Sequence, residues 1–310
     1  MTDKPQDDHD ATAFDSIEPM KTPLEERQEL LAHHVRLIAR KVSHALFTFS
    51  QGGLGKSRMI LQTLKQEGVE PVLINSHITP LALYGVLYRH RTEEILFFDD
   101  VDSMYSSMAH LGLLRSALWG SPRVVTYGSS QLPDDLPSSF ETTARFIFAA
   151  NVIPMKNDAF KAVLSRCDIY QLEASNEEII EMMRSLAVRG YQGITPEDAG
   201  AVIDFIAEHS DDRQLSLRLL GPSLRKLRYA RESGIDWRLL VKSQLQTLGK
   251  KADATKRLDN RTKDLRVLEQ VLRRFPESVA EQQAEWSKAT GKSRASFFRA
   301  LARFRDENNG

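Results

Sequence analysis

Short apolar runs alternate with longer amphipathic stretches through the first half of the chain. The apolar runs predict strands at 45–49, 70–75, 94–98, 145–150 and 168–172. Apolar residues at helical spacing predict helices at 24–41, 80–89, 103–119 and 157–165, with a further helix directly after the first strand. A short strand or hairpin arm is expected at 123–127 and a loop at 128–143. Because strand and helix alternate, the pattern predicts a parallel sheet with helices on both faces.

The strand signal ends near residue 173, and only helical spacing follows. Ser175 with Glu178 three positions later forms a capping box, which predicts the start of a helix. Further helices are expected at 196–209, 215–232, 235–248, 262–275, 278–289 and 293–306. The predicted organisation is a disordered acidic segment at 1–22, an α/β core at 23–173, a helical lid at 174–249, a linker at 250–261 and a small all-α domain at 262–310.

A glycine-rich segment, SQGGLGKS, follows the first predicted strand. It matches the phosphate-binding pattern G-x-x-x-x-G-K-[ST] except that Ser50 replaces the first glycine. Glycines lack Cβ, so the backbone can turn its N–H groups toward phosphate oxygens. The pattern places a lysine at the β- and γ-phosphates of ATP and a hydroxyl on Mg²⁺. The expected nucleotide-binding residues are Gly52, Gly53, Leu54, Gly55, Lys56, Ser57 and Arg58.

Two acidic residues end the predicted strand at 94–98. Asp99 is expected to contact Mg²⁺ through water, together with Ser57, and Asp100 to orient or deprotonate an attacking water. Asp102 is also close in sequence, but the residues after it predict a helix start, so it is expected to be an N-cap. A phosphate loop and an acidic strand end together predict ATP hydrolysis.

At this point the chain resembles the AAA+ ATPase superfamily, and three further segments follow in that family's order. Asn151, after the strand at 145–150, resembles the sensor-1 polar residue beside the γ-phosphate. Arg166 resembles the arginine finger that reaches a neighbouring subunit's nucleotide, and Arg218 resembles the sensor-2 arginine of the lid. The resemblance implies an oligomeric ATPase with a ring or open helical arrangement. The family's second acid is usually Glu, and the shorter Asp100 suggests slow, partner-stimulated turnover.

Near the C-terminus, a helix is expected to end at Thr290–Gly291 and another to start after Ser293. This resembles the helix-turn-helix segments of plasmid and phage replication proteins and of site-specific recombinases. Trp286, Phe297 and Leu301 would form the core, with Phe298 as a further candidate. The expected DNA-binding residues are Lys292, Arg294, Ser296, Arg299 and Arg303. A basic helical bundle that binds a protein partner is the alternative.

The net charge of the chain is zero, but the charge is unevenly spread. Residues 1–30 contain nine acids and three bases, whereas residues 250–310 contain fifteen bases and nine acids. A basic C-terminal end fits contact with nucleic acid. The single cysteine and the absence of a secretory signal or a long apolar run suggest a cytoplasmic protein without a membrane partner.

The sequence therefore predicts a DNA-associated AAA+ ATPase that uses ATP and Mg²⁺ to remodel duplex DNA or a DNA-bound partner. Replication initiation or helicase loading and the transposition of a mobile element are the candidate processes. A helicase, an initiator or a transposase is the candidate partner. The alternative from another class is an ATP-binding switch with weak hydrolysis in a regulatory or defence complex.

Overall fold

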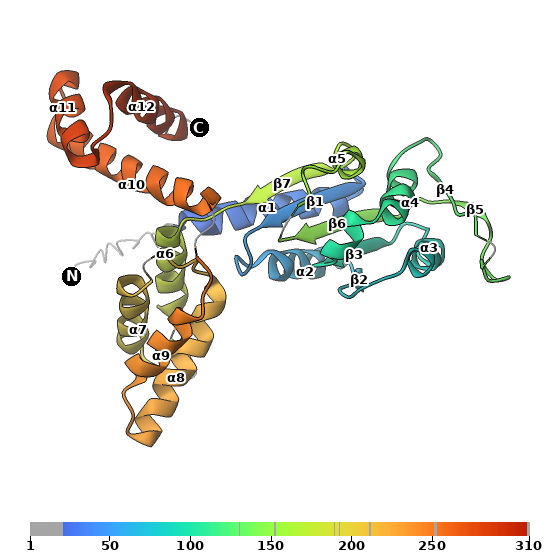
Figure 1. Cartoon of the computed structure of the whole chain (residues 1–310), viewed down its shortest axis with the longest axis horizontal. Coiled ribbons are helices and arrows are strands. Elements are labelled where there is room, and N and C mark those ends of the chain that lie inside the picture. The colour runs from blue at the N-terminus through green and yellow to red at the C-terminus, as the bar shows by residue number, and fades with distance from the viewer. Residues whose placement is uncertain are drawn as a thin grey trace, which may run out of the picture.

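The computed structural model describes residues 21–308 except positions 130, 152, 189, 192, 211, 251 and 252, so the expected disordered segment lies almost wholly outside the described residues. Three groups of elements extend from a common centre (Figure 1). They are an α/β core, a second group of helices from α6 to α9, and the C-terminal helices α10 to α12.

Five parallel strands form the main sheet in the order β2-β3-β6-β1-β7. The strands are β1 (Ala45–Ser50), β2 (Val72–Ile74), β3 (Ile95–Asp99), β6 (Arg145–Ala150) and β7 (Asp168–Leu172). The helices of the core are α1 (Pro23–Ala39), α2 (Lys56–Gln66), α3 (Pro80–Arg89), α4 (Met108–Leu118) and α5 (Asp158–Leu164). The predicted fold class, a parallel sheet between helices, is confirmed.

Alternate side chains of each strand enter different cores, as the two-residue period of a strand requires. Leu46 of β1 packs with apolar residues of α1 and α2. Its neighbour Phe47 points to the opposite face and stacks on Phe148, which in turn stacks on Phe98. Helices α3, α4 and α5 cover this aromatic face. Both faces of the sheet are therefore buried, which explains the continuous apolar runs in the sequence.

Two predictions within the core are corrected. The helix expected at 103–119 is split into a 3₁₀ helix, η1 (Asp102–Ser106), and α4. The segment expected to be a loop at 128–143 contains β5 (Ser139–Glu141), which pairs antiparallel with β4 (Val124–Thr126). Only Phe140 of β5 is buried, so a single apolar position carried too weak a pattern to predict a strand.

The second group comprises α6 (Asn176–Ala187), α7 (Pro196–Glu208), η2 (Leu217–Leu219), α8 (Leu220–Ser233) and α9 (Trp237–Gln246). The expected capping box at Ser175 is present, and apolar residues of α6, α7 and α8 continue the core beneath α1. Arg27 of α1 also donates hydrogen bonds to Glu178 of α6, at 2.5 Å, and to the Glu173 carbonyl. Helix α6 is thus fastened to the α/β core by packing and by a partly buried ion pair.

The C-terminal group consists of α10 (Asp253–Arg274), α11 (Val279–Thr290) and α12 (Arg294–Asn308) around a separate small core. The expected core residues Trp286, Phe297 and Leu301 are buried there, but Phe298 is 41% exposed and lies outside it. Most of the segment expected to be a linker, 250–261, belongs to α10, which begins at Asp253. Arg266 of α10 forms ion pairs with Glu177 (3.2 Å) and Glu181 (3.7 Å) of α6.

Candidate nucleotide site

The loop between β1 and α2 has a backbone shape that requires glycine. Gly53 and Gly55 have φ values of +83° and +87°, in the left-handed region that side chains disfavour. A Cβ on Gly53 would also lie 2.6 Å from the Cβ of Ser216, so the second helical group closes directly over this loop. The Leu217 amide donates to the Gly53 carbonyl at 3.0 Å. The loop is therefore held between the core and η2.

Lys56 stands at the first turn of α2 and is 6% exposed. Its ammonium donates to Ser50 Oγ at 3.0 Å and to Asn151 Oδ1 at 3.1 Å. Burial lowers the pKa of Lys56, and the carboxylates of Asp100 and Asp99 oppose that shift. The sequence comparison treated Ser50 only as a departure from the pattern. In the structure the Ser50 hydroxyl accepts a hydrogen bond from the Lys56 ammonium.

Ser57 and Asp99 form the second contact of the loop. The Ser57 hydroxyl donates to Asp99 Oδ1 at 2.7 Å. Burial raises the pKa of Asp99, and the hydrogen bond from Ser57 lowers it in part. Magnesium prefers one or two protein oxygens and otherwise binds substrate phosphates and water. A hydroxyl and a carboxylate side by side fit that requirement, and no cluster of three or more His, Cys, Asp or Glu side chains suited to a metal occurs among the described residues.

Asn151 connects the lysine to the second acid. Its amide nitrogen donates to Asp100 Oδ1 at 2.6 Å, while its Oδ1 accepts from Lys56. The strand order explains this arrangement, because β6 lies between β1 and β3 and its carboxyl end meets theirs at one edge. Asp100 has a φ of +55°, so its backbone adopts a conformation that is uncommon for a residue with a side chain.

Asp102 is not the N-cap that its sequence position predicts. It is the first residue of η1, and Val101 occupies the cap position. Within the described part of the chain, Asp102 Oδ1 is buried without a hydrogen-bond partner. Burial raises the pKa of this carboxyl, and the nearby charge of Asp100 raises it further. Its surroundings therefore oppose the charged form, unlike the solvated end of a surface helix.

A cavity of about 430 Å³ opens above these groups. At one end it exposes the polar groups of Lys56, Ser57, Asp100 and Asn151, and Arg218 of η2 faces it from the second helical group. The further lining residues are Gln28, Gly53, Gly55, Arg58, Met59, Gln62, Met182, Leu186 and Leu217. The cavity thus has a charged end at the sheet and an apolar margin formed by α2 and α6.

Sequence reasoning missed the contribution of α1 to this cavity. Gln28 lies on the buried stripe of α1 between Leu24 and Leu31, and its amide donates to the Leu54 carbonyl at 2.7 Å. It also stands 3.0 Å from the position that a Cβ on Gly55 would take. A buried glutamine within an apolar helix face was the available signal, because such a group needs a hydrogen-bond partner.

Arg166 lies away from its own cavity. It precedes β7, whose first residue Asp168 pairs with Leu46 near the start of β1. This is the amino edge of the sheet, opposite the edge that bears Lys56. The Arg166 guanidinium lies over the Trp119 ring at 5.2 Å and donates to the Ala162 carbonyl. Arg166 therefore can complete a nucleotide site only if that site belongs to another subunit.

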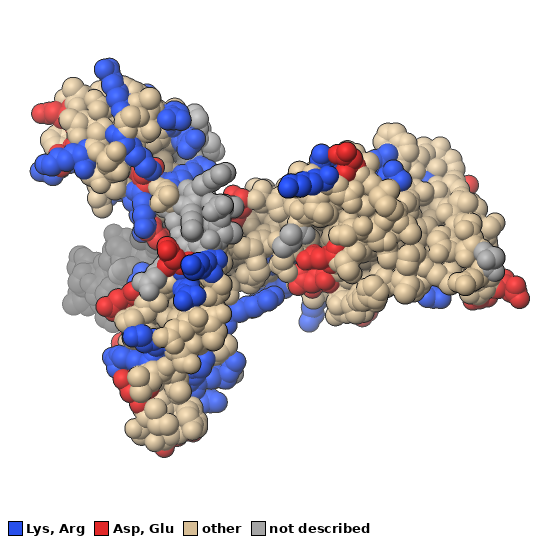
Figure 2. Space-filling view, viewed as in Figure 1, with Lys and Arg blue, Asp and Glu red and all other residues tan. Residues whose placement is uncertain are grey.

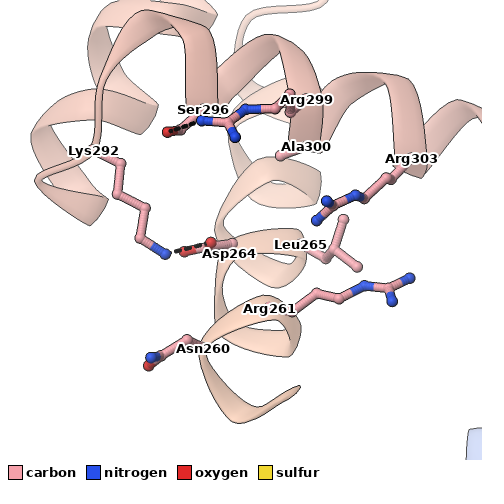
Figure 3. Close-up of a pocket in the computed structure, with 9 residues that line it drawn as sticks. All are labelled: Asn260, Arg261, Asp264, Leu265, Lys292, Ser296, Arg299, Ala300 and Arg303. Carbon is pink, nitrogen blue, oxygen red and sulfur yellow. Dashed lines mark hydrogen bonds and ion pairs between the residues drawn. The ribbon is translucent and has the colours of Figure 1, made fainter. Parts of the chain in front are cut away.

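The expected DNA-binding residues lie on two sides of α12. Lys292 is paired with Asp264 at 2.5 Å, so it does not project freely as expected. Arg294 lies over the Phe298 ring at 5.6 Å. Arg299 donates to Ser296 Oγ at 3.2 Å. Arg299, Ser296 and Arg303 face a cleft against α10 (Figure 3).

Comparison with known proteins gives similar structures but no sequence relative. No protein-family model matches the chain, and no curated protein matches it. The Thermotoga maritima RuvB Holliday junction branch migration motor is 14% identical, with a TM-score of 0.46 over 88% of this chain and 83% of that one. The Aeropyrum pernix Orc1 protein, solved in complex with DNA, is 11% identical, with a TM-score of 0.47 over 94% and 85%. Similarity of this size establishes no activity.

No helix among the described residues has both the length and the apolar character needed to cross a membrane.

Proposed function

We propose that this chain is a DNA-associated ATPase of the AAA+ type that binds ATP with Mg²⁺ in the cavity above the sheet. The observation that carries the proposal is the connected set of contacts from Ser50 through Lys56 and Asn151 to Asp100, beside the Ser57–Asp99 pair. These groups come from three strand ends and one helix start. They meet at the place where the loop glycines turn toward the same cavity.

Each group has a role in phosphoryl transfer to water. Lys56 would neutralise terminal phosphate oxygens, and Ser57 with Asp99 would hold Mg²⁺, which offsets the charge on those oxygens when bound. Asp100 would accept a proton from the attacking water, and Asn151 would hold the Asp100 carboxylate and the water in position. Arg218 would contact the phosphates of its own subunit, and Arg166 those of a neighbouring subunit.

A role for Arg166 in hydrolysis would require oligomers. An arginine at the opposite edge of the sheet contributes to hydrolysis only when subunits pack head to tail, which produces rings or open helical assemblies. The nucleotide would then control the position of α6 to α9 against the loop, since η2 contacts Gly53 directly. Such movement, passed to α10 through Arg266, would remodel bound duplex DNA or a DNA-bound partner during replication initiation, helicase loading or transposition.

ATP binding by the full chain tests the site. A fluorescent ATP analogue should bind in the presence of Mg²⁺, and Ser57→Ala should weaken the Mg²⁺-dependent part of the affinity by about tenfold. Ser116→Ala is a matched control, because the Ser116 hydroxyl donates to the Gly112 carbonyl within its own helix, α4. If Ser57→Ala and Ser116→Ala bind the analogue as the natural chain does, the proposed site is wrong.

A second candidate function is a nucleotide switch that binds ATP but hydrolyses it poorly. The observation that favours it is Asp100 itself. Its side chain is one methylene shorter than that of Glu, and one of its oxygens already accepts a hydrogen bond from Asn151. A shorter, restrained carboxylate is less able to reach a water at the γ-phosphate. Binding without turnover in the presence of DNA would favour this function.

A further inference from the structure

A cavity of about 350 Å³ lies at the amino edge of the main sheet, where the parallel strands begin. We call it the amino-edge cavity. It opens between the segments that precede β1, β3 and β4 and the first residue of β6. Its charged and polar lining residues include Lys41, His44, Glu93, Arg123, Thr143 and Arg145. None of these residues lines the nucleotide cavity, which lies at the opposite edge of the sheet.

Arg145 brings a buried positive charge to this cavity, since only 8% of the residue is exposed. Its Nη1 donates to the Ile38 and Ala39 carbonyls at 2.6 and 2.8 Å. Its Nη2 donates to the Glu93 carbonyl at 2.7 Å. Its Nε is buried and has no hydrogen-bond partner among the described residues. The guanidinium is thus bonded to neutral carbonyls, and burial of a charge without a bonded counter-ion is unfavourable.

Arg123 brings a second guanidinium to the same cavity. Its Nη1 donates to the Ala117 carbonyl near the end of α4 at 3.1 Å. Within the described part of the chain, Arg123 has no further hydrogen bond and no ion pair. Burial lowers the pKa of Arg123, and burial and then the Arg123 charge lower the pKa of His44 beside it. A guanidinium carries five N–H donors, so most of those on Arg123 remain available.

The cavity contains too little negative charge to balance these arginines. Glu93 is the one acidic residue that lines it, and the Glu93 carboxylate is paired with Lys41. The carbonyls at the ends of α1 and α4 favour nearby cations, but they occupy only part of the donors. The arginines are also not part of a generally basic surface. Figure 2 shows Lys and Arg side chains gathered on the C-terminal helices and few on the visible face of the α/β core.

We infer that the amino-edge cavity binds a small dianionic oxyanion of the phosphate type. Two guanidinium charges match the two charges of such an ion, and guanidinium groups hydrogen-bond phosphate oxygens in pairs. No Phe, Tyr or Trp lines the cavity, and Val42 is its one apolar lining residue, so it offers no surface for a base. The ion would connect Arg123, before β4, with Arg145 of β6. This site goes beyond the proposed function, because it does not involve ATP.

The test is calorimetric titration of inorganic phosphate into the full chain carrying Lys56→Ala, so that the phosphate loop does not contribute. One phosphate should bind with a dissociation constant of about 1 mM or lower. Addition of Arg123→Gln should weaken binding at least about tenfold, because one of the two guanidinium groups is lost. Arg213→Gln is the matched control, since Arg213 also donates to a carbonyl, that of Leu248, and lines neither cavity.

A local signal shows where the phosphate binds. The ring resonances of His44, assigned by comparison with His44→Gln, should shift as phosphate is added. Circular dichroism checks that each variant is folded. If Arg123→Gln does not fold, Arg123→Lys replaces it. This variant keeps the charge but loses the planar fork, so it should weaken phosphate binding severalfold.

Three results would overturn the inference. They are no phosphate binding below about 10 mM, equal binding by the Arg123 and Arg213 variants, and binding that leaves His44 unshifted. The first two would mean that the arginines serve only the helix ends, and the third would place the phosphate elsewhere. ATP binding by the natural chain is measured separately. A chain that binds ATP but shows any of these results retains the proposed function.

Discussion

The nucleotide cavity and the cleft between α10 and α12 are both lined by cationic side chains, but these side chains differ in burial and in hydrogen bonding. In the cavity Lys56 is 6% exposed and bonded to two neighbours, while the half-buried Asp99 and the exposed Asp100 each accept a hydrogen bond from a neighbouring side chain. In the cleft Arg299 and Arg303 are exposed and bonded at most to their own helix. Charges that fix one another in this way suit catalysis, because they need no rearrangement as the reaction proceeds. Exposed charges suit a ligand whose affinity salt can adjust.

The largest effect should follow from the loss of the buried cation. Lys56→Ala should abolish ATP turnover, a loss of at least about a thousandfold, because it removes the buried positive charge between Ser50 and Asn151. Lys65→Ala, a change of an exposed lysine on the same helix, should leave turnover unchanged. Phosphate release by well-folded variants measures both. Equal rates of phosphate release by Lys56→Ala and Lys65→Ala would mean that the buried lysine of the cavity has no special role in turnover.

The next effect concerns the bridging amide. Asn151→Ala should reduce turnover by about a hundredfold while ATP still binds, because the bridge from Lys56 to Asp100 is lost. Asn157→Ala is a matched control, since Asn157 caps α5 through the amides of Ala159 and Phe160. The control should lower the unfolding free energy by about 1 kcal/mol and spare turnover. A reversed pattern would place Asn151 outside the catalytic network.

Arg166 tests whether the cavity is completed between subunits. Arg166→Ala should lower turnover by roughly tenfold to a hundredfold without a change in ATP affinity, because the guanidinium lies at the opposite edge of the sheet. When Arg166→Ala chains are mixed with Asp100→Asn chains, which retain Arg166, part of the ATP turnover should return. Turnover that changes neither on mixing nor with protein concentration would contradict action across an interface.

On the cleft side, single changes should have smaller and more graded effects. Arg299→Ala should weaken binding to all duplex sequences about tenfold, as expected for a phosphate contact. Arg294→Ala should alter the order of preference among sequences instead, because the start of a recognition helix reaches base edges in helix-turn-helix proteins. Anisotropy with a panel of duplexes separates the two. Identical effects on every sequence would remove any base-reading role from Arg294.

The smallest effect should come from Ser50. Ser50→Gly restores the usual first residue of the phosphate loop but removes one hydrogen bond to Lys56. Turnover should fall by no more than about tenfold, since Asn151 still holds the ammonium. The measurement is turnover at saturating ATP. An increase instead would mean that Ser50 restrains Lys56 unproductively.

The sheet and its polar edge could be predicted because their signals are local. Each buried strand is a continuous apolar run; Asp99 and Asn151 lie at the ends of such runs, and Lys56 follows the glycine-rich loop after the first one. Parallel strands then bring these residues to one edge. The start of the second helical group could also be predicted, since Ser175 and Glu178 form a capping box that marks the beginning of α6.

Other features depend on contacts between distant segments or on weak local patterns. The Gln28 contact to Leu54 and the Lys292 pair with Asp264 join residues on separate helices, so no spacing rule reveals them. The helix across the expected linker was missed for a different reason. Residues 253–274 contain neither Gly nor Pro, and residues such as Ala254, Lys256 and Arg257 favour helix, so α10 extends backward through a polar stretch.

In the proposed function, the polar network above the sheet hydrolyses ATP in a chain that acts on DNA. The most direct measurement is steady-state phosphate release from ATP and Mg²⁺ by the full chain, with and without duplex DNA, with Lys56→Ala as the blank. Phosphate release above the blank is expected, with a further rise when duplex is added. Release equal to the blank under both conditions, by a chain that still binds ATP, would contradict it.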